Sequence, residues 1–388
     1  MKILILSYET FNNVGEELLG DSTEYLFRSL NESEISRAQL VPSYKDAIKY
    51  NKFAWLGMPL QYIGLKLSNR GKNIHKLWKL IYYIRLKAYY ECLIRQNDLI
   101  VLAVGMLKFR NQNFSYIYSI ICDIATRYHK DVIFNAMSIA KADNEDLRYH
   151  QLVDAINMPC VKGVSTRDGD AGINLLRKCY INRPNILIDE VGDPALWIPQ
   201  VYNLFKNVES TLLGINVINP SIYANYNFED FSKEQVESLY KEIVSELESR
   251  KYNWVFFCNG MSGDYAFGKK LLEECHLPPS KLFPCPKCAE EYLHQIVQFK
   301  AVFGARLHSD ISAVALGIPV VGLLWDSKLK YFSETMGISQ FFVSVRELNG
   351  KAIVNKLEEA MNHDNNYESR DNYRTKTKKF LGSFIFNN

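Results

Sequence analysis

The sequence contains no long apolar run and little excess of charge of either sign. No stretch approaches the ~20 apolar residues that a transmembrane helix requires. The 46 Lys and Arg residues nearly balance the 43 Asp and Glu residues, and a net charge of +3 does not by itself indicate a nucleic-acid-binding protein. The chain opens with a strand-like run over residues 1–6, which is too short for the apolar part of a signal peptide. We therefore expect a cytoplasmic protein.

Complete metal-binding and dinucleotide-binding motifs are also missing. The pair Cys285 and Cys288 has the spacing of half a zinc site, and Cys275 and His276 lie nearby, but no second CxxC or HxxxH motif completes the pattern. Most of the eight cysteines lie in apolar surroundings, where a reduced thiol acts as a small hydrophobic group. The GxGxxG fingerprint is absent. We expect no bound metal and no cofactor.

Short apolar runs alternate with helical patterns along almost the whole chain. Near-continuous apolar strands between helices are typical of parallel sheets covered on both faces. The predicted strands are 2–7, 98–104, 131–136, 160–165, 185–189, 211–217, 253–258, 300–303, 319–324 and 340–344. The predicted helices are 15–30, 73–95, 115–129, 144–157, 168–179, 232–249, 264–275, 288–297, 308–317, 328–336, 349–362 and 373–384.

The alternation pauses at residues 193–206, which contain two prolines and precede a new strand. We expect an α/β protein of two doubly wound, Rossmann-like domains, 1–205 and 206–365, with a cleft between them. Residues 366–388 are expected to form a polar linker and a basic helix that packs back on the first domain.

Residues 66–95 differ from the rest of the chain, because eight basic residues accompany a single acidic one, Glu91. Tyrosines, Trp78 and aliphatic residues are interleaved with them at helical spacing. Such a helix suits the surface of an anionic bilayer. The simpler alternative is a core helix whose outer face is basic, and the sequence leaves both open.

Small and polar residues follow several predicted strands, at the ends where ligands of parallel sheets bind. After the first strand come Asn13, Gly15 and Glu16, a turn in which Asn13 could cap the next helix and Gly15 permits a close backbone approach. A well-capped helix alone would also explain this turn. Gly105 and Ser138 follow the strands 98–104 and 131–136.

Basic residues follow two further strands. Arg167 lies at a strand-to-helix junction, where a guanidinium can bind carboxylate or phosphate, although it could instead pair with Asp168. Arg306 and His308 follow the strand 300–303 and begin a helix, whose N-terminus favours anions.

Two more residues complete this group. Lys328 lies just beyond the strand 319–324 and is either a ligand-binding cation or a solvated surface lysine. Asp310 either complements the start of the helix or orients His308. Together these residues indicate a site that holds a small, highly charged anion and moves a proton.

The ordered motifs of this chain resemble those of the polysaccharide pyruvyl transferase family, from the first strand to about residue 345. The match consists of Asn13-Val14-Gly15-Glu16, Ala103-Val104-Gly105, Arg167-Asp168, Asp193-Pro194-Ala195, Arg306-Leu307-His308, Gly317-Ile318-Pro319 and Asp326-Ser327-Lys328. The resemblance implies a GT-B-like fold of two domains. It also implies transfer of pyruvyl from phosphoenolpyruvate to sugar hydroxyls as a cyclic ketal.

By this resemblance, Arg167, Arg306 and Lys328 bind phosphoenolpyruvate, and His308 moves the proton. Ser138 is expected on the same donor side because it follows the strand 131–136. Asn13, Gly15, Glu16 and Gly105 would then line the acceptor side of the cleft. Phosphoenolpyruvate is a co-substrate in this scheme. The acceptor would be a sugar of a cell-surface or exopolysaccharide precursor, such as a lipid-linked one reached by peripheral contact with the inner face of the membrane.

Two alternatives remain open at this point. The same anion site could hold the diphosphate of a nucleotide sugar in a GT-B glycosyltransferase. The chain could also be a catalytically silent family member within a glycan-assembly complex.

Overall fold

The computed structural model describes residues 1–9, 13–31, 33–57, 59–60, 62, 75–109, 114–222, 232–345, 349–363 and 368–386. The chain forms two compact units. The first contains residues 1–8, 23–191 and 377–388, and the second contains residues 9–22 and 192–376. Nothing in the sequence of residues 9–22 predicts that they belong to the second unit.

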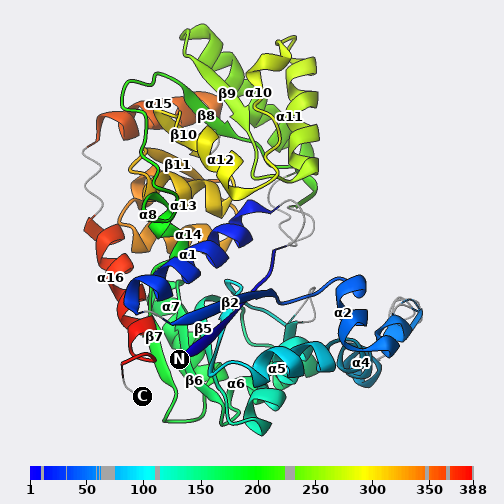
Figure 1. Cartoon of the computed structure of the whole chain (residues 1–388). Helices are drawn as coiled ribbons and strands as arrows, with labels where there is room; N and C mark the ends of the chain where they lie inside the picture. The colour runs from blue at the N-terminus through cyan, green and yellow to red at the C-terminus, as the bar shows by residue number, and fades with distance from the viewer. Residues whose placement is uncertain are drawn as a thin grey trace. The chain divides into compact units, whose positions relative to one another are not determined.

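The first unit is built on a parallel sheet, of which Figure 1 labels β2, β5, β6 and β7. The strand order is β2-β1-β3-β5-β6-β7, and a short strand, β4, pairs with β5. Its strands are β1 (Lys2–Ser7), β2 (Glu34–Gln39), β3 (Leu99–Ala103), β4 (Met106–Leu107), β5 (Asp131–Ile139), β6 (Val161–Thr166) and β7 (Leu187–Glu190).

The second unit is built on a parallel sheet with the order β12-β11-β10-β8-β9. Its strands are β8 (Leu213–Asn216), β9 (Trp254–Phe257), β10 (Ala301–Gly304), β11 (Val320–Leu324) and β12 (Phe342–Ser344). The chain direction across the sheet reverses between β8 and β10. Ligands of doubly wound sheets bind at this point, outside the carboxyl ends of the strands.

Helices connect the strands of both sheets. In the first unit these are α2 (Tyr44–Tyr50), α4 (His75–Arg95), α5 (Phe114–Arg127), α6 (Leu147–Ile156) and α7 (Gly169–Leu175), with a 3₁₀ helix over Lys52–Leu56 and a π-helical turn over Leu176–Tyr180. In the second they are α8 (Ile198–Tyr202), α10 (Lys233–Ser249), α11 (Ser262–Glu274), α12 (Ala289–Ile296), α13 (Leu307–Ala315), α14 (Ser327–Thr335) and α15 (Gly350–Asn362), with 3₁₀ helices over Pro194–Trp197, Pro279–Lys281 and Ser339–Phe341.

Two helices span the division between the units: α1 (Val14–Leu30) and α16 (Glu368–Gly382). The part of α16 in the second unit supports α13. Arg374 donates hydrogen bonds to the carbonyls of Leu196 and Ala315, and Arg370 donates to those of Val314 and Ala315. These cations satisfy carbonyls at the C-terminal end of α13, where the helix dipole favours positive charge.

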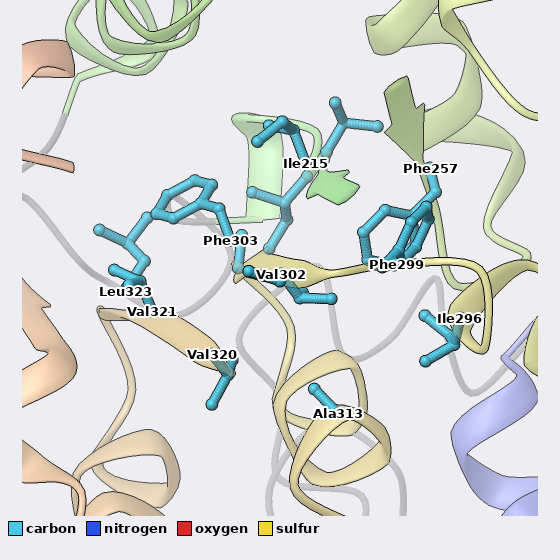
Figure 2. Close-up of a cluster of buried hydrophobic side chains, with 14 of the residues drawn as sticks. Ile215, Phe257, Ile296, Phe299, Val302, Phe303, Ala313, Val320, Val321 and Leu323 are labelled. Carbon is cyan, nitrogen blue, oxygen red and sulfur yellow. The ribbon is translucent and has the colours of Figure 1, made fainter. Parts of the chain in front are cut away.

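The core of the second unit lies on both faces of its sheet. Figure 2 shows Val302 and Phe303 of β10 among side chains of the neighbouring strands, with Ala313 of α13 beside them. All four residues of β10 are buried, as expected for a central parallel strand with both faces covered. This packing holds α13 against the strand whose end precedes Arg306.

All ten predicted strands are present, but two others were not predicted. The strand β2, with the sequence EISRAQ, lies at the edge of its sheet and keeps several residues partly exposed, so it has no apolar run. The prediction that β5 ends at residue 136 is wrong. The strand continues to Ile139 through a register shift at Ala136, whose φ of 52° lies in the left-handed region.

The predicted basic aromatic helix is present over its described part and buries one side in the core. The described helix α4 covers His75–Arg95, and residues 66–74 of the predicted segment lie outside the described residues. Tyr89 and Tyr90 are buried and donate to the carbonyls of Gln39 and Leu40. Among the described residues, no helix has the length and apolar character needed to cross a membrane.

Candidate functional site

His308 lies in the first turn of α13 and packs directly against the backbone of Gly15. A Cβ atom built on Gly15 would lie 2.1 Å from Nδ1 and 2.5 Å from Cγ of the imidazole. Side chains essentially never approach so closely, so only glycine leaves room for this ring position. The position of the His308 imidazole therefore depends on the absence of a side chain at Gly15, 293 residues earlier in the chain.

The start of α1 is held in place by three hydrogen bonds within the second unit. The Asn13 side chain accepts from the N–H of Gly15 at 3.3 Å, and the N–H of Val14 donates to the carbonyl of Asn259, also at 3.3 Å. The Glu17 carboxylate accepts from the N–H of Ala289, the first residue of α12, at 2.9 Å. A carboxylate at a helix N-terminus is favourable for both charge and hydrogen bonding. These contacts fix Gly15 beside His308.

Arg306 is held by a bidentate ion pair with Asp264. Its Nε lies 2.5 Å from Oδ2 and its Nη2 lies 2.9 Å from Oδ1. The carboxylate also accepts from the N–H of Asn219 at 2.8 Å and is almost fully buried. The pair orients the guanidinium and offsets its charge, while Nη1 makes no hydrogen bond within the described residues. Arg306 is therefore suited to directional hydrogen bonding more than to supplying net positive charge.

A buried hydrogen-bond network joins the ends of three strands beneath this pair. Asn216, the last residue of β8, donates through Nδ2 to Oδ1 of Asn259 at 2.9 Å. The Ser309 hydroxyl donates to Oδ1 of Asn216 at 3.3 Å, and the Tyr240 hydroxyl donates to the Asn216 carbonyl at 2.8 Å. The first two bonds connect the ends of β8, β9 and β10, and so fix the chain that leads into α13.

Asp310 lies in the same turn of α13 and is fully buried against Gly304. Neither carboxylate oxygen has a hydrogen-bond partner among the described residues. Burial therefore raises the pKa of Asp310 well above its ordinary value and favours the neutral acid. The described contacts include no hydrogen bond between Asp310 and His308 that would orient the imidazole.

Lys328 lies in the first turn of α14, just after β11. The Asp326 side chain caps the helix by accepting from the N–H of Lys328 at 3.0 Å. The indole of Trp325 donates to the carbonyl of Ala305 at 2.6 Å, which ties the end of β11 to the end of β10. Lys328 is half-buried as a residue and has no ion-pair partner in the described part of the chain. It is a source of uncompensated positive charge near this edge of the sheet.

In the first unit, Arg167 donates from Nη2 to the carbonyl of Gly105 at 3.1 Å. Asp168 accepts instead from the Ser138 hydroxyl at 2.8 Å and from the N–H of Ile139 at 2.7 Å. The Ser138 hydroxyl therefore holds Asp168, and its expected role in binding the donor stays a prediction. Gly105 has a φ of 64°, which favours glycine at this turn.

The cysteine pattern forms no metal centre in the described residues. Cys285 lies beside Cys258 rather than Cys288, with 3.7 Å between the two sulfur atoms. Burial raises the pKa of both thiols, which disfavours the thiolate that a metal would require.

The structure brings together Asn13, Gly15, Arg306 and His308 within the second unit, and places Gly105, Ser138 and Arg167 in the first. Glu16 is buried in the first turn of α1. Sequence reasoning missed Asp264, Asn216 and Asn259. Asn259 carried a usable signal, because it directly follows the predicted strand 253–258, whereas Asn216 lies within the predicted strand 211–217. Asp264 resembled an ordinary acidic residue in the first turn of a helix.

Solved structures of low sequence identity share this architecture. The UDP-GlcNAc 2-epimerase of Methanocaldococcus jannaschii, in complex with UDP-GlcNAc and UDP, is 14% identical with a TM-score of 0.57, over 100% of both chains. The UDP-GlcNAc 2-epimerase of Neisseria meningitidis, bound to UDP-GlcNAc, is 10% identical with a TM-score of 0.51, over 100% of both chains. None of the curated proteins matches the sequence significantly.

The fold is thus GT-B-like, with two parallel-sheet α/β domains. The family model for polysaccharide pyruvyl transferase matches residues 13–327, most of the chain. The protein belongs to the polysaccharide pyruvyl transferase family, a family of transferases in polysaccharide biosynthesis.

Replacing Gly15 by Ala should displace the imidazole of His308, because the new methyl group would occupy the position of Nδ1. We expect a changed Cε1–Hε1 resonance of His308 in NMR spectra, assigned with a His308→Gln variant, and activity lowered by about 10- to 100-fold. Gly382→Ala is the matched control, since its Cβ would meet its neighbours at ordinary contact distance. An unchanged His308 resonance in a folded Gly15→Ala protein would show that the close approach is absent.

Replacing Asp310 by Asn should remove a pH-dependent loss of stability. The raised pKa means that the native state retains a proton that the unfolded state releases above about pH 4. Wild-type stability should therefore fall with rising pH, by about 1.4 kcal/mol per unit, relative to Asp310→Asn until the native pKa is reached. Urea unfolding at several pH values between 4 and 8 measures this difference, with Asp170→Asn as an exposed control. Parallel curves for wild type and Asp310→Asn would contradict it.

Proposed function

We propose that this protein transfers a pyruvyl group from phosphoenolpyruvate to two hydroxyls of one sugar, forming a cyclic ketal and releasing phosphate. The observation that carries the proposal is the placement of His308 against Gly15, beside Arg306, at the point where the strand order reverses. Family membership supports the reaction class.

The residues of the second unit supply the groups that this reaction needs. Phosphoenolpyruvate carries a carboxylate and a phosphate, for which Lys328 provides charge and Arg306 a directed N–H donor. We also propose Arg167, the residue that follows β6, as a ligand of the donor, and the family membership supports this role. Gly105 is assigned to the acceptor side.

The proton chemistry is assigned to His308. Its imidazolium would protonate the methylene carbon of phosphoenolpyruvate, which leaves an oxocarbenium-like centre at the adjacent carbon. One sugar hydroxyl bonds to that carbon, and a second then displaces phosphate, whose C–O bonding electrons leave with the phosphate. One hydroxyl proton returns to His308 and the other leaves on the phosphate, so the reaction balances.

The acceptor is proposed to be a sugar of a cell-surface polysaccharide precursor carried on a lipid. The solved structures of similar fold contain UDP or UDP-GlcNAc, so a nucleotide sugar is the competing ligand that the experiments must include.

The His308→Gln variant should lose phosphate release and ketal formation, because glutamine cannot act as a proton donor and acceptor in this way. We expect turnover to fall by about 10²- to 10⁴-fold. Purified protein is incubated with phosphoenolpyruvate and candidate lipid-linked glycans, and products are identified by mass spectrometry. Near-normal turnover by His308→Gln would exclude this role.

The same assay separates the alternative functions. Transfer from a nucleotide sugar, with no pyruvylated product, would favour the glycosyltransferase. Binding of phosphoenolpyruvate without turnover would favour the silent family member.

Lys328→Met should raise KM for phosphoenolpyruvate with little change in kcat. Loss of a charge-assisted contact to a bound anion predicts a rise of about 10- to 100-fold. Lys330→Met in the same helix is the matched control, because Lys330 is exposed and its ammonium lies 3.7 Å from Glu334. Equal KM values for the two variants in steady-state assays would exclude a donor-binding role for Lys328.

A further inference from the structure

Exposed apolar side chains are concentrated in one short part of the first unit. Of the thirteen large apolar side chains that are exposed in the described residues, seven lie between residues 48 and 83. Six of these stand on α2, on the 3₁₀ helix that follows it, and on α4. We call these six the 48–83 patch: Ile48, Tyr50, Phe53, Trp55, Leu80 and Tyr83.

The elements that carry the patch pack against one another, and Figure 1 shows α2 beside α4. The Asn51 side chain donates to the carbonyl of Ile84 at 3.0 Å, and the Arg85 guanidinium lies 4.0 Å from the ring centroid of Tyr44. Arg85 is buried and donates to the carbonyl of Pro42. The exposed side chains therefore project from a well-supported base. Phe53 and Trp55 are 66% and 50% exposed, respectively.

The exposed side of α4 combines apolar and basic residues at helical spacing. Lys76, Leu80, Tyr83 and Lys87 follow one another at intervals of four, three and four residues, which places them on one side of the helix. Tyr89 and Tyr90 lie in the core, as the alternative of a core helix with a basic outer face implied. The side of α4 that is open to a binding partner therefore excludes these two tyrosines.

The charge around the patch is strongly one-sided. Residues 44–87 contain ten Lys and Arg residues and a single acidic residue, Asp46, which pairs with Lys49 at 2.8 Å. The rest of the chain has an excess of acidic residues, with 42 against 36 basic ones. A local basic surface with exposed aromatic and aliphatic side chains complements an anionic lipid bilayer, because the lysines attract the headgroups and the aromatic rings suit the interface.

We propose that the 48–83 patch docks this protein on the surface of an anionic lipid bilayer. Ile48, Phe53 and Trp55 enter the headgroup region, while Lys76 and Lys79 bind lipid phosphates. The biological reason rests on the proposed function, since a lipid-linked acceptor would be presented at such a surface. Binding to the bilayer can be measured independently of pyruvyl transfer, so the two proposals are tested separately.

Flotation of the full-length protein with lipid vesicles through a sucrose gradient tests the proposal. Wild type should float with vesicles that contain phosphatidylglycerol and remain unbound with phosphatidylcholine alone, and binding should weaken as salt is raised. Phe53→Ser/Trp55→Ser and Lys76→Glu/Lys79→Glu should each lower the partition coefficient by about tenfold or more. The matched controls are Phe205→Ser/Val208→Ser, which removes two apolar side chains that are even more exposed, and Lys178→Glu/Lys351→Glu, which reverses two exposed lysines elsewhere.

Undiminished flotation of both patch variants would overturn the proposal, as would equal binding to neutral vesicles. If the patch variants instead convert a dimer into a monomer in sedimentation velocity, the occupant is a second copy of the chain. Pyruvyl transfer to a soluble acceptor fragment should be unaffected by the patch variants. Wild type that floats but transfers no pyruvyl group would overturn the proposed function and leave docking intact.

Discussion

The close approach of Gly15 to the His308 imidazole is the contact on which the arrangement of this site depends. A side chain at residue 15 would occupy the space of the ring, so the start of α1 and the start of α13 can be adjacent only with glycine there. Asn13, Val14 and Glu17 hold that end of α1 in the second unit. The first helix of the chain is thereby part of the support of a histidine that the chain reaches only much later.

The second sheet explains why the polar groups converge at this place. Its strand order reverses between β8 and β10, and the ends of these strands carry Asn216 and the turn to Arg306. Hydrogen bonds through Asn216 join three strand ends, and the Trp325 indole adds the end of β11. Rigid strand ends place functional groups more reliably than long loops do. The buried polar side chains of Asn216, Asn259 and Ser309 thus fix the turn that leads to His308.

Much of this architecture could be predicted from the sequence, because central parallel strands such as β10 are short apolar runs and the polar residues after them mark strand ends. The edge strand β2 has no such run. It could not be predicted because it forms only by pairing with β1, which is a contact between residues distant in the sequence. The contact between Gly15 and His308 could not be predicted from the sequence near either residue, because a glycine at the start of a helix has several explanations. Spacing along α4 also identified an amphipathic helix without showing that Tyr89 and Tyr90 face the core.

Two carboxyl groups at this end of the sheet differ in charge and therefore in their electrostatic effect. Asp264 forms a bidentate pair with Arg306, so it orients the guanidinium and cancels most of its field. Asp310 is buried without a partner in the described residues, and its raised pKa favours the neutral form, which adds no negative charge near His308. The net positive potential for an anion then comes from Lys328 and from the N-terminus of α13. An ionised Asp310 would oppose both, so burial of this carboxyl group helps to keep this end of the sheet attractive to the anionic donor proposed above.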